Sequence, residues 1–347
     1  MPRERTFFLV LATLIVAGFA VGHFSQSRRE VQPELAVHPR PQAERARTWR
    51  QPSFVKTLEI SPATGAPLVR PLSLKEERSG DLLVLDWSAG SVRRFSPSGE
   101  EKVSYHLPAG AKGGSPEDFD VDAAGNVWIC YHDDGTVAEL DPGGRLLQTW
   151  HLASRPHRVL TSNEEARLVA FAADNGPDLF DRYSGKGELL GGFGRLLAGG
   201  AQDLLTLDGD VAHDGAGGFV YVATHTGLLA SYSLTGEPRF LVESIDPVPL
   251  PKLIENSGQP HRLAPGSRLA GLTVSVSGDQ VYVLVDLPSE NGESTRALDV
   301  YSNRDGKYLY SFKAPERTPF ALVAGDRLYT IHEDVVTRWV MAPGKQG

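Results

Sequence analysis

The stretch DVDAAGNVWI, residues 120–129, carries the clearest structural signal in the chain. A short strand that alternates polar and apolar residues runs to Asp122, and a second, apolar strand begins at Val127. The turn between them contains Gly125, which suits a tight hairpin because glycine adopts positive φ without a steric penalty. The stretch therefore predicts a β-hairpin.

This combination of a turn and an apolar second strand recurs along the 347 residues. Most copies begin with glycine, and a weaker one begins with Glu165. The six copies, about 40 to 60 residues apart, are Gly80–Val84, Gly125–Ile129, Glu165–Val169, Gly218–Val222, Gly278–Val283 and Gly325–Tyr329. Repeats of this length indicate an array of similar structural units.

A second series of strands interleaves with the first, and each member follows another glycine turn. Its members are Lys102–Leu107, Leu146–Leu152, Leu189–Phe193, Arg239–Ile245 and Tyr308–Lys313. Each repeat thus provides four short antiparallel strands, which form one blade of a β-propeller. The 36 Gly and 24 Pro residues are typical of a chain with many short strands and turns.

The sixth repeat lacks its outer strand, because the chain ends soon after the strand Val335–Met341. An unassigned strand near the N-terminus, Phe54–Ile60, has the pattern of the missing one. Its donation to the last blade would close the ring and remove an open sheet edge. The sequence thus predicts an all-β, six-bladed β-propeller closed by an N-terminal strand.

Residues 120–129, with their inner strand, Gly-Asn turn and second strand, resemble the six-bladed propellers of the NHL-repeat and related bacterial families. The resemblance extends over residues 52–341, and the second repeat carries it best. It implies the propeller architecture. These families include ligand-binding scaffolds, sensor domains, lactone hydrolases and lyases, so the resemblance alone selects no function.

The first thirty residues have the pattern of a targeting element. Arg3 and Arg5 precede the uncharged apolar run Phe7–Val21, and small residues follow it. Ala20-Val21-Gly22 fits a cleavage site, whereas residues 7–24 are just long enough to cross a bilayer as one hydrophobic helix. We therefore predict a signal peptide or a signal anchor over residues 1–29. Both place the rest of the chain outside the cytoplasm, as a periplasmic or secreted domain, anchored to the membrane if the segment is uncleaved.

Residues 30–51 are rich in Pro, Arg, Glu and Gln and show no periodic apolar pattern, which predicts a flexible tether. The propeller then occupies residues 52–342, and residues 343–347 form a tail. The net charge of −8 and the absence of a long basic run argue against nucleic acid as a partner.

Motifs for cofactors and catalysis are absent from the sequence. The single cysteine, Cys130, excludes an internal disulfide and a zinc site made of several thiolates. There is no His-Glu-x-x-His motif, no Gly-x-Ser-x-Gly elbow and no phosphate-binding loop. We predict no cofactor and assign no catalytic or metal-binding residue.

Polar residues collect on one face of the predicted disc. The turns between first and second strands, and between third and fourth, share the opposite face, where glycine and backbone geometry explain the sequence. The connections between blades and the turns between second and third strands carry the candidate binding residues, which are Glu117, Asp118, His132, His157, Arg158, Asp210, His225, Asp286, His332 and Glu333. Several of these residue types are also ordinary turn residues.

Two functions fit this pattern. The first is an extracytoplasmic recognition or scaffold domain that binds a protein, peptide or glycan through its polar face. The alternative is a metal-assisted hydrolase or lyase, similar to propeller lactonases, with a divalent metal at the channel mouth. Three or more carboxylate or imidazole groups converging on one point would favour the enzyme.

Overall fold

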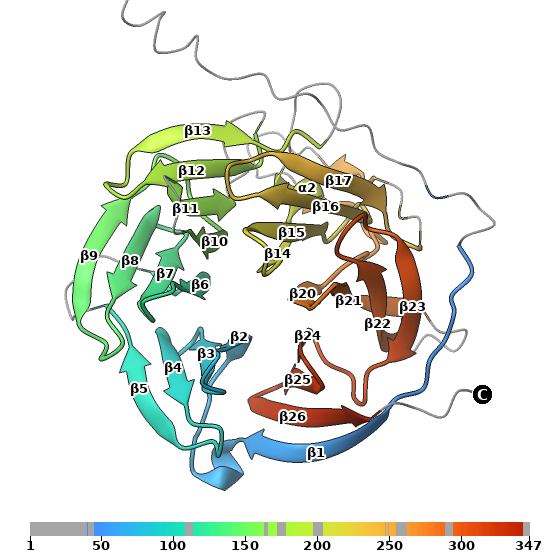
Figure 1. Ribbon diagram of the computed structural model, residues 1–347, viewed down its shortest axis with the longest axis horizontal. Coiled ribbons are helices and arrows are strands. Elements are labelled where there is room, and N and C mark those ends of the chain that lie inside the picture. Colours follow the sequence, from blue (N-terminus) through green and yellow to red (C-terminus); the bar gives the residue numbers. More distant parts are fainter. Residues whose placement is uncertain are drawn as a thin grey trace, which may run out of the picture. The chain divides into compact units, whose positions relative to one another are not determined.

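The computed structural model describes residues 40, 45–107, 114–162, 166–171, 178–196, 204–246, 248, 250–254, 262–288 and 294–342. Six four-stranded antiparallel sheets are arranged in a ring around a central axis, each with its first strand innermost (Figure 1). Blade 1 contains β2 (Pro71–Glu76), β3 (Leu82–Asp86), β4 (Ser91–Phe95) and β5 (Glu101–Tyr105). Blade 2 contains β6 (Asp118–Val121), β7 (Val127–Tyr131), β8 (Thr136–Leu140) and β9 (Leu146–His151). Blade 3 contains β10 (Arg158–Thr161), β11 (Ala166–Phe171), β12 (Phe180–Ser184) and β13 (Leu189–Phe193).

The remaining blades follow in chain order. Blade 4 contains β14 (Gly209–His213), β15 (Gly218–Ala223), β16 (Leu228–Ser233) and β17 (Pro238–Glu243). Blade 5 contains β20 (Thr273–Ser277), β21 (Gln280–Pro288), β22 (Ser294–Ser302) and β23 (Tyr308–Lys313). Blade 6 contains β24 (Phe320–Ala324), β25 (Arg327–His332), β26 (Val335–Ala342) and β1 (Ser53–Ile60). The short elements outside the blades are η2 (Pro62–Thr64), α2 (Leu204–Leu207), β18 (Leu253–Ile254) and β19 (Arg262–Leu263).

The closure predicted from the sequence is confirmed. Strand β1 pairs antiparallel with β26, with Phe54 opposite Met341 and Ile60 opposite Val336. The first and last parts of the propeller therefore share one sheet, and the outer edge of β26 is covered. The six-bladed, all-β fold follows from this pairing.

The second strand of each blade is apolar because both of its faces are covered. In β3, Leu82 and Val84 pack toward blade 6, whereas Leu83 and Leu85 pack toward blade 2. This division follows the two-residue period of a strand. Six such apolar clusters occur, one between each pair of neighbouring blades.

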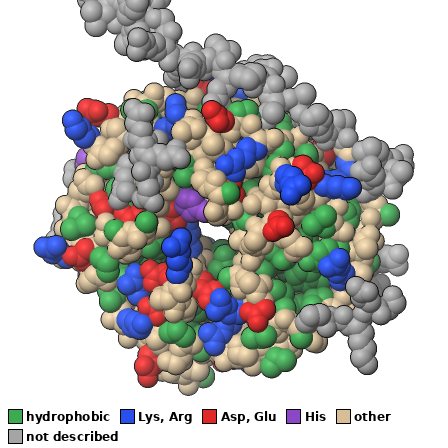
Figure 2. Space-filling model, in the orientation of Figure 1, with side chains coloured by type: hydrophobic (Ala, Val, Ile, Leu, Met, Phe, Trp, Pro, Cys, Tyr) green, Lys and Arg blue, Asp and Glu red, His purple; other side chains and the backbone are tan. Residues whose placement is uncertain are grey.

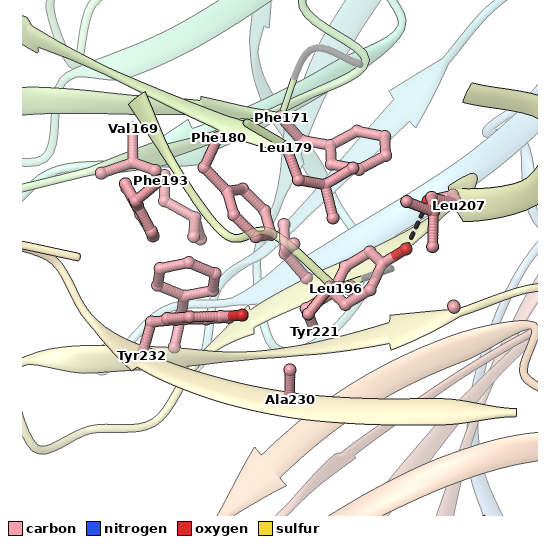
Figure 3. Packing of buried hydrophobic residues seen from close by; sticks show 14 of the residues in the cluster. Val169, Phe171, Leu179, Phe180, Phe193, Leu196, Leu207, Tyr221, Ala230 and Tyr232 are labelled. Atoms are coloured by element: carbon pink, nitrogen blue, oxygen red, sulfur yellow. Dashed lines mark hydrogen bonds between the residues drawn. The ribbon is translucent and has the colours of Figure 1, made fainter. Parts of the chain in front are cut away.

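The cluster between blades 3 and 4 is the most aromatic. The ring of Phe180 lies 5.3 Å from that of Phe193 and 4.9 Å from that of Phe219, measured between centroids. The hydroxyl of Tyr221 donates a hydrogen bond to the carbonyl oxygen of Leu207, so this buried phenol is satisfied (Figure 3). Blade 3 is the weakest repeat in sequence, yet its side of this interface is fully packed.

Side chains on the inner strands satisfy backbone N–H groups of the next blade. The carboxylates of Asp118 and Asp120 accept from the N–H groups of Val159 and Thr161 at 3.0 and 2.7 Å. The same relationship joins the later blades, through the pairs Asp210–Val274 (2.8 Å), Ser275–Val323 (3.1 Å) and Ser277–Gly325 (2.8 Å). An inner strand is a sheet edge, so these acceptors at alternate positions replace a missing neighbouring strand.

The end of the predicted tether contacts the propeller. Residues 45–50, which we call the strap, lie against blades 4 and 5. Within the strap, Arg47 bonds both Asp246 (2.6 Å) and Asp299 (2.8 Å) through Nη2, and the N–H of Arg50 donates to the carbonyl oxygen of Ser311 at 2.8 Å. The predicted signal or anchor, most of the tether and the tail lie outside the described residues. Within the described part of the chain, no helix is long and apolar enough to cross a membrane.

Candidate functional site

The two ends of the channel carry different connections. Each inner strand begins at the face where the blades are joined and where second strands turn into third strands; we call this the connection face. Each inner strand ends at the opposite face, in a turn that contains glycine, such as Gly80 or Gly125, both with positive φ. We call that side the glycine-turn face.

Three charged residues from three inner strands meet at the connection face. Arg158 Nε lies 3.3 Å from Asp210 Oδ1, and the Arg158 guanidinium also bonds the carbonyl oxygen of His157 at 2.8 Å. Burial raises the pKa of Asp118 to about 6, against the opposing charges of Lys75 and Arg158. Burial also raises the pKa of Asp210, with Arg158 acting against it. These two carboxylates therefore have altered acidity.

Beside this group lies a pair of histidines. The rings of His132 and His157 have centroids 3.9 Å apart and planes inclined by 34°. His157 Nδ1 lies 4.0 Å from Glu117 Oε1, and this interaction lowers the pKa of Glu117. The edge-to-face contact of His157 with Phe171 at 6.2 Å fixes the ring from the other side.

The structure thus gathers six of the ten candidate residues, from blades 2, 3 and 4, around one channel mouth: Glu117, Asp118, His132, His157, Arg158 and Asp210. The other four lie in blades 4, 5 and 6, in strands or in the turns next to them. His225 contacts the carbonyl oxygen of Arg268 at 3.4 Å, and Asp286 pairs with Arg296 on the adjacent strand. His332 ends β25, and Glu333, with φ of 54°, forms the turn that follows.

A further polar cluster, which the sequence analysis did not identify, lies toward the glycine-turn face. The Asp120 carboxylate is bonded by Lys75 Nζ at 2.7 Å, by His213 Nε2 at 2.7 Å and by the Thr161 hydroxyl at 2.9 Å. Burial would raise the pKa of Asp120, but the Lys75 and His213 contacts overcome it and hold that pKa well below its ordinary value. The alternation of Asp118 and Asp120 on one short strand is the signal that could have found it.

A cavity of about 1320 Å³ opens at this end of the channel. Lys75, Asp120 and His213 line it, together with the turns that follow β2, β6 and β14. Figure 2 shows charged side chains of both signs beside the central opening, over blades 1 and 2, and more apolar side chains over blades 5 and 6. A large concave site with perturbed titratable groups is a typical location for ligand binding.

Potential metal ligands are dispersed in the part of the chain that the structure describes. No group of three or more His, Cys, Asp or Glu side chains there is arranged to hold a metal ion. Cys130 is buried, and burial raises the pKa of its thiol well above the ordinary range.

Comparison with known proteins gives the fold and no family. No protein-family model matches the chain, and no curated protein matches it. Among solved structures it is similar to a Bacteroides fragilis protein proposed to be exported (TM-score 0.57, 10% identity, covering 85% of this chain and 95% of that one). It is also similar to a DUF4221 family member from Bacteroides vulgatus (0.54, 10%, 84% and 98%). A third similar structure is virginiamycin B lyase from Staphylococcus aureus (0.52, 12%, 84% and 100%). At these identities the likeness concerns architecture, and the chain is a six-bladed β-propeller.

Proposed function

We propose that this chain is an extracytoplasmic recognition propeller that binds a protein, peptide or glycan at the channel mouth of its connection face. The observation that carries the proposal is the convergence of Glu117, His132, His157 and Arg158 from two blades. Hydrogen-bond donors and acceptors meet there, and they include both acidic and basic groups. The site is partly desolvated, so polar contacts with a ligand are stronger there than at an open surface.

The polar groups at this mouth differ in how much of the fold depends on them. Asp118 and Asp210 each accept a backbone N–H from the next blade, so they serve the architecture as well. The Glu117 side chain is 35% exposed, more than those of His157 (16%) and Arg158 (24%). Glu117 is therefore the member of this group most available to a ligand.

Binding is tested with peptide and glycan arrays probed with the full-length chain. We expect a defined set of ligands whose signal falls at least about tenfold in Glu117→Gln combined with His132→Gln, because charged hydrogen bonds contribute about 1.5–3 kcal/mol each. Arg145→Gln, at the 79% exposed Arg145 on the glycine-turn face, is the matched control and should bind normally. Equal loss in both variants, or no retained ligand with the wild type, would contradict the proposal.

The extracytoplasmic location is supported by the sequence of the first 24 residues, with Arg3 and Arg5 ahead of an apolar run. The similar Bacteroides fragilis propeller is itself proposed to be exported. The test is a reporter that is active only outside the cytoplasm, fused after Gly347. Activity is expected there, and activity from a reporter that works only in the cytoplasm would refute the location.

A further inference from the structure

The cavity at the glycine-turn face has a floor made of three charged or ionisable side chains. Lys75 Nζ and His213 Nε2 each lie 2.7 Å from a different oxygen of the Asp120 carboxylate, whose side chain is only 3% exposed. The Thr161 N–H and hydroxyl occupy the remaining positions on Oδ2 at 2.7 and 2.9 Å. Oδ2 is therefore fully engaged, and burial keeps the Asp120 carboxylate nearly inaccessible to a ligand.

The donors on this floor still have unused capacity. An ammonium group has three N–H donors, and the described residues take one of them from Lys75, through Asp120. His213 is held through Nε2, and within the described chain its Nδ1 has no hydrogen-bond partner. Both side chains line the cavity, and they are 27% and 36% exposed. The groups that a ligand can reach on the floor are therefore nitrogen atoms.

The carboxylates of the cavity wall are already engaged. Asp122 accepts from the N–H groups of its own turn and from Trp128 Nε1. The other wall carboxylates each pair with a cation, in Glu76–Arg327, Glu77–Arg94, Asp81–Lys102 and Asp214–Arg239. Arg78, also on the wall, is exposed and has no ion-pair partner among the described residues. Arg78 is therefore a cation without an ion-pair partner among the described residues, and Lys75 keeps N–H donors to spare, although acidic residues outnumber basic ones in the lining.

We propose that this cavity is a second binding site, separate from the connection face, and that it takes a small hydrophilic carboxylate. The ligand carboxylate accepts hydrogen bonds from the remaining N–H donors of Lys75, beside the His213 ring, with Arg78 at the rim. Charge-assisted hydrogen bonds of this kind are the stronger ones in proteins. Ser79, Asn303 and the glycine turns supply a polar wall that suits hydroxyl groups on the rest of the ligand.

The test compares three sugars of the same ring size that differ in charge. Calorimetric titration of the full-length chain uses D-glucuronate, D-glucose and D-glucosamine, with citrate as a second carboxylate of different shape. We expect saturable binding of a carboxylate, at least about tenfold tighter than that of the neutral and the cationic sugar. Equal affinity for the three sugars, or no binding of either carboxylate up to about 50 mM, would overturn the proposal.

Two variants locate the site. Lys75→Gln keeps a hydrogen-bond donor beside Asp120 and removes the positive charge, and His213→Gln keeps a donor and removes the imidazole ring from the floor. Each should weaken carboxylate binding, Lys75→Gln at least about tenfold. His106→Gln, at an exposed histidine that lies outside the cavity lining, should bind as the wild type does. Unchanged affinity in a folded His213→Gln variant would refute the site. Because the connection-face proposal depends on Glu117 and His132, the two proposals fail independently.

Discussion

Asp120 and His213 lie 93 positions apart in the sequence and on blades 2 and 4, yet His213 Nε2 contacts Asp120 Oδ2 at 2.7 Å near the end of the channel. Blade 3 lies between these two blades, and the N–H of its Thr161, on β10, donates to the same carboxylate oxygen. Together with the contact from Lys75 on β2, one side chain thus ties four inner strands together. Asp120 therefore contributes both to the contacts between blades and to the floor of the cavity.

The closing strand should be essential to the fold. Removing residues 1–62 deletes β1 and exposes the edge of β26, and we expect aggregation or loss of cooperative unfolding. Removing residues 1–44 leaves both the strap and β1 in place, so this shorter truncation should unfold cooperatively. Thermal unfolding monitored by circular dichroism compares them. Indistinguishable unfolding curves for the two truncations would argue against closure by β1.

The strap should stabilise blade 5 through one arginine. Asp299 has a side chain that is 1% exposed, and among the described residues Arg47 is its only cationic partner within salt-bridge distance. Arg47→Ala leaves this carboxylate buried and unpaired, so we expect about 3–5 kcal/mol of destabilisation in urea unfolding. Adding Asp299→Asn should recover part of that loss.

The control for this experiment is an exposed ion pair within β1, the strand that follows the strap. Lys56 pairs with Glu59 at 2.7 Å, and its side chain is 51% exposed. Lys56→Ala should destabilise the protein far less than Arg47→Ala does, because solvent screens such pairs. A similar loss in both single variants would mean that the strap contact is no stronger than an ordinary surface pair.

The stability of the protein should depend on pH through Asp118. Burial raises its pKa to about 6, so the folded state holds this proton more tightly than the unfolded state. Its contribution to stability is therefore fully present below about pH 4 and is lost as the pH rises through about 6. Asp118→Asn is neutral throughout, so its melting temperature should rise relative to the wild type between about pH 5 and about pH 7.

Asp141→Asn provides the comparison for this pH effect. The N–H of Arg145 donates to the Asp141 carboxylate and lowers its pKa, so that group stays ionised over the same interval. Its difference from the wild type should be constant between about pH 5 and about pH 7. A difference for Asp118→Asn that is equally flat would show that its acidity is ordinary.

Two serine hydroxyls accept backbone N–H groups between blades 5 and 6, and they should contribute differently to the stability of the protein. Ser275 accepts the N–H of Val323 at 3.1 Å in a buried place, whereas Ser277 accepts the N–H of Gly325 at 2.8 Å in an exposed one. Ser275→Ala should destabilise by about 1–3 kcal/mol, because the orphaned N–H has no access to water. Ser277→Ala should be nearly neutral. Equal destabilisation of the two variants in chemical unfolding would show that hydrogen bonding to the edge of the inner strand does not explain these serines.

The sequence predicted the architecture because the blade period is written in local patterns. The apolar run Val127–Tyr131 and the turn at Gly125 are explained by their immediate neighbours, and six copies fix the number of blades. The orphan strand Phe54–Ile60 could be placed because one blade lacked a partner for it. Each of these inferences needs only strand periodicity and turn geometry.

The candidate sites depended on contacts that local patterns do not encode. His132 and His157 lie 25 residues apart and stack only because blades 2 and 3 are neighbours at that face. Lys75 and His213 were not identified, since neither belongs to a motif and they share only their contact with Asp120. The strap was predicted as part of a tether because its sequence has no periodic apolar pattern. The partners of Arg47, which are Asp246 and Asp299, lie about 200 or more positions away in the sequence.

The position of the strap determines how a mechanical load would enter the propeller. A pull on the chain ahead of residue 45 reaches Arg47 and the strap–β23 hydrogen bonds before it reaches β1. The two-pronged contact of Arg47 with Asp246 and Asp299 then carries the tension into blades 4 and 5. The strand that closes the ring, in blade 6, remains unloaded until this contact ruptures. We therefore expect a force applied at the N-terminal end to break the strap contacts before it separates β1 from β26.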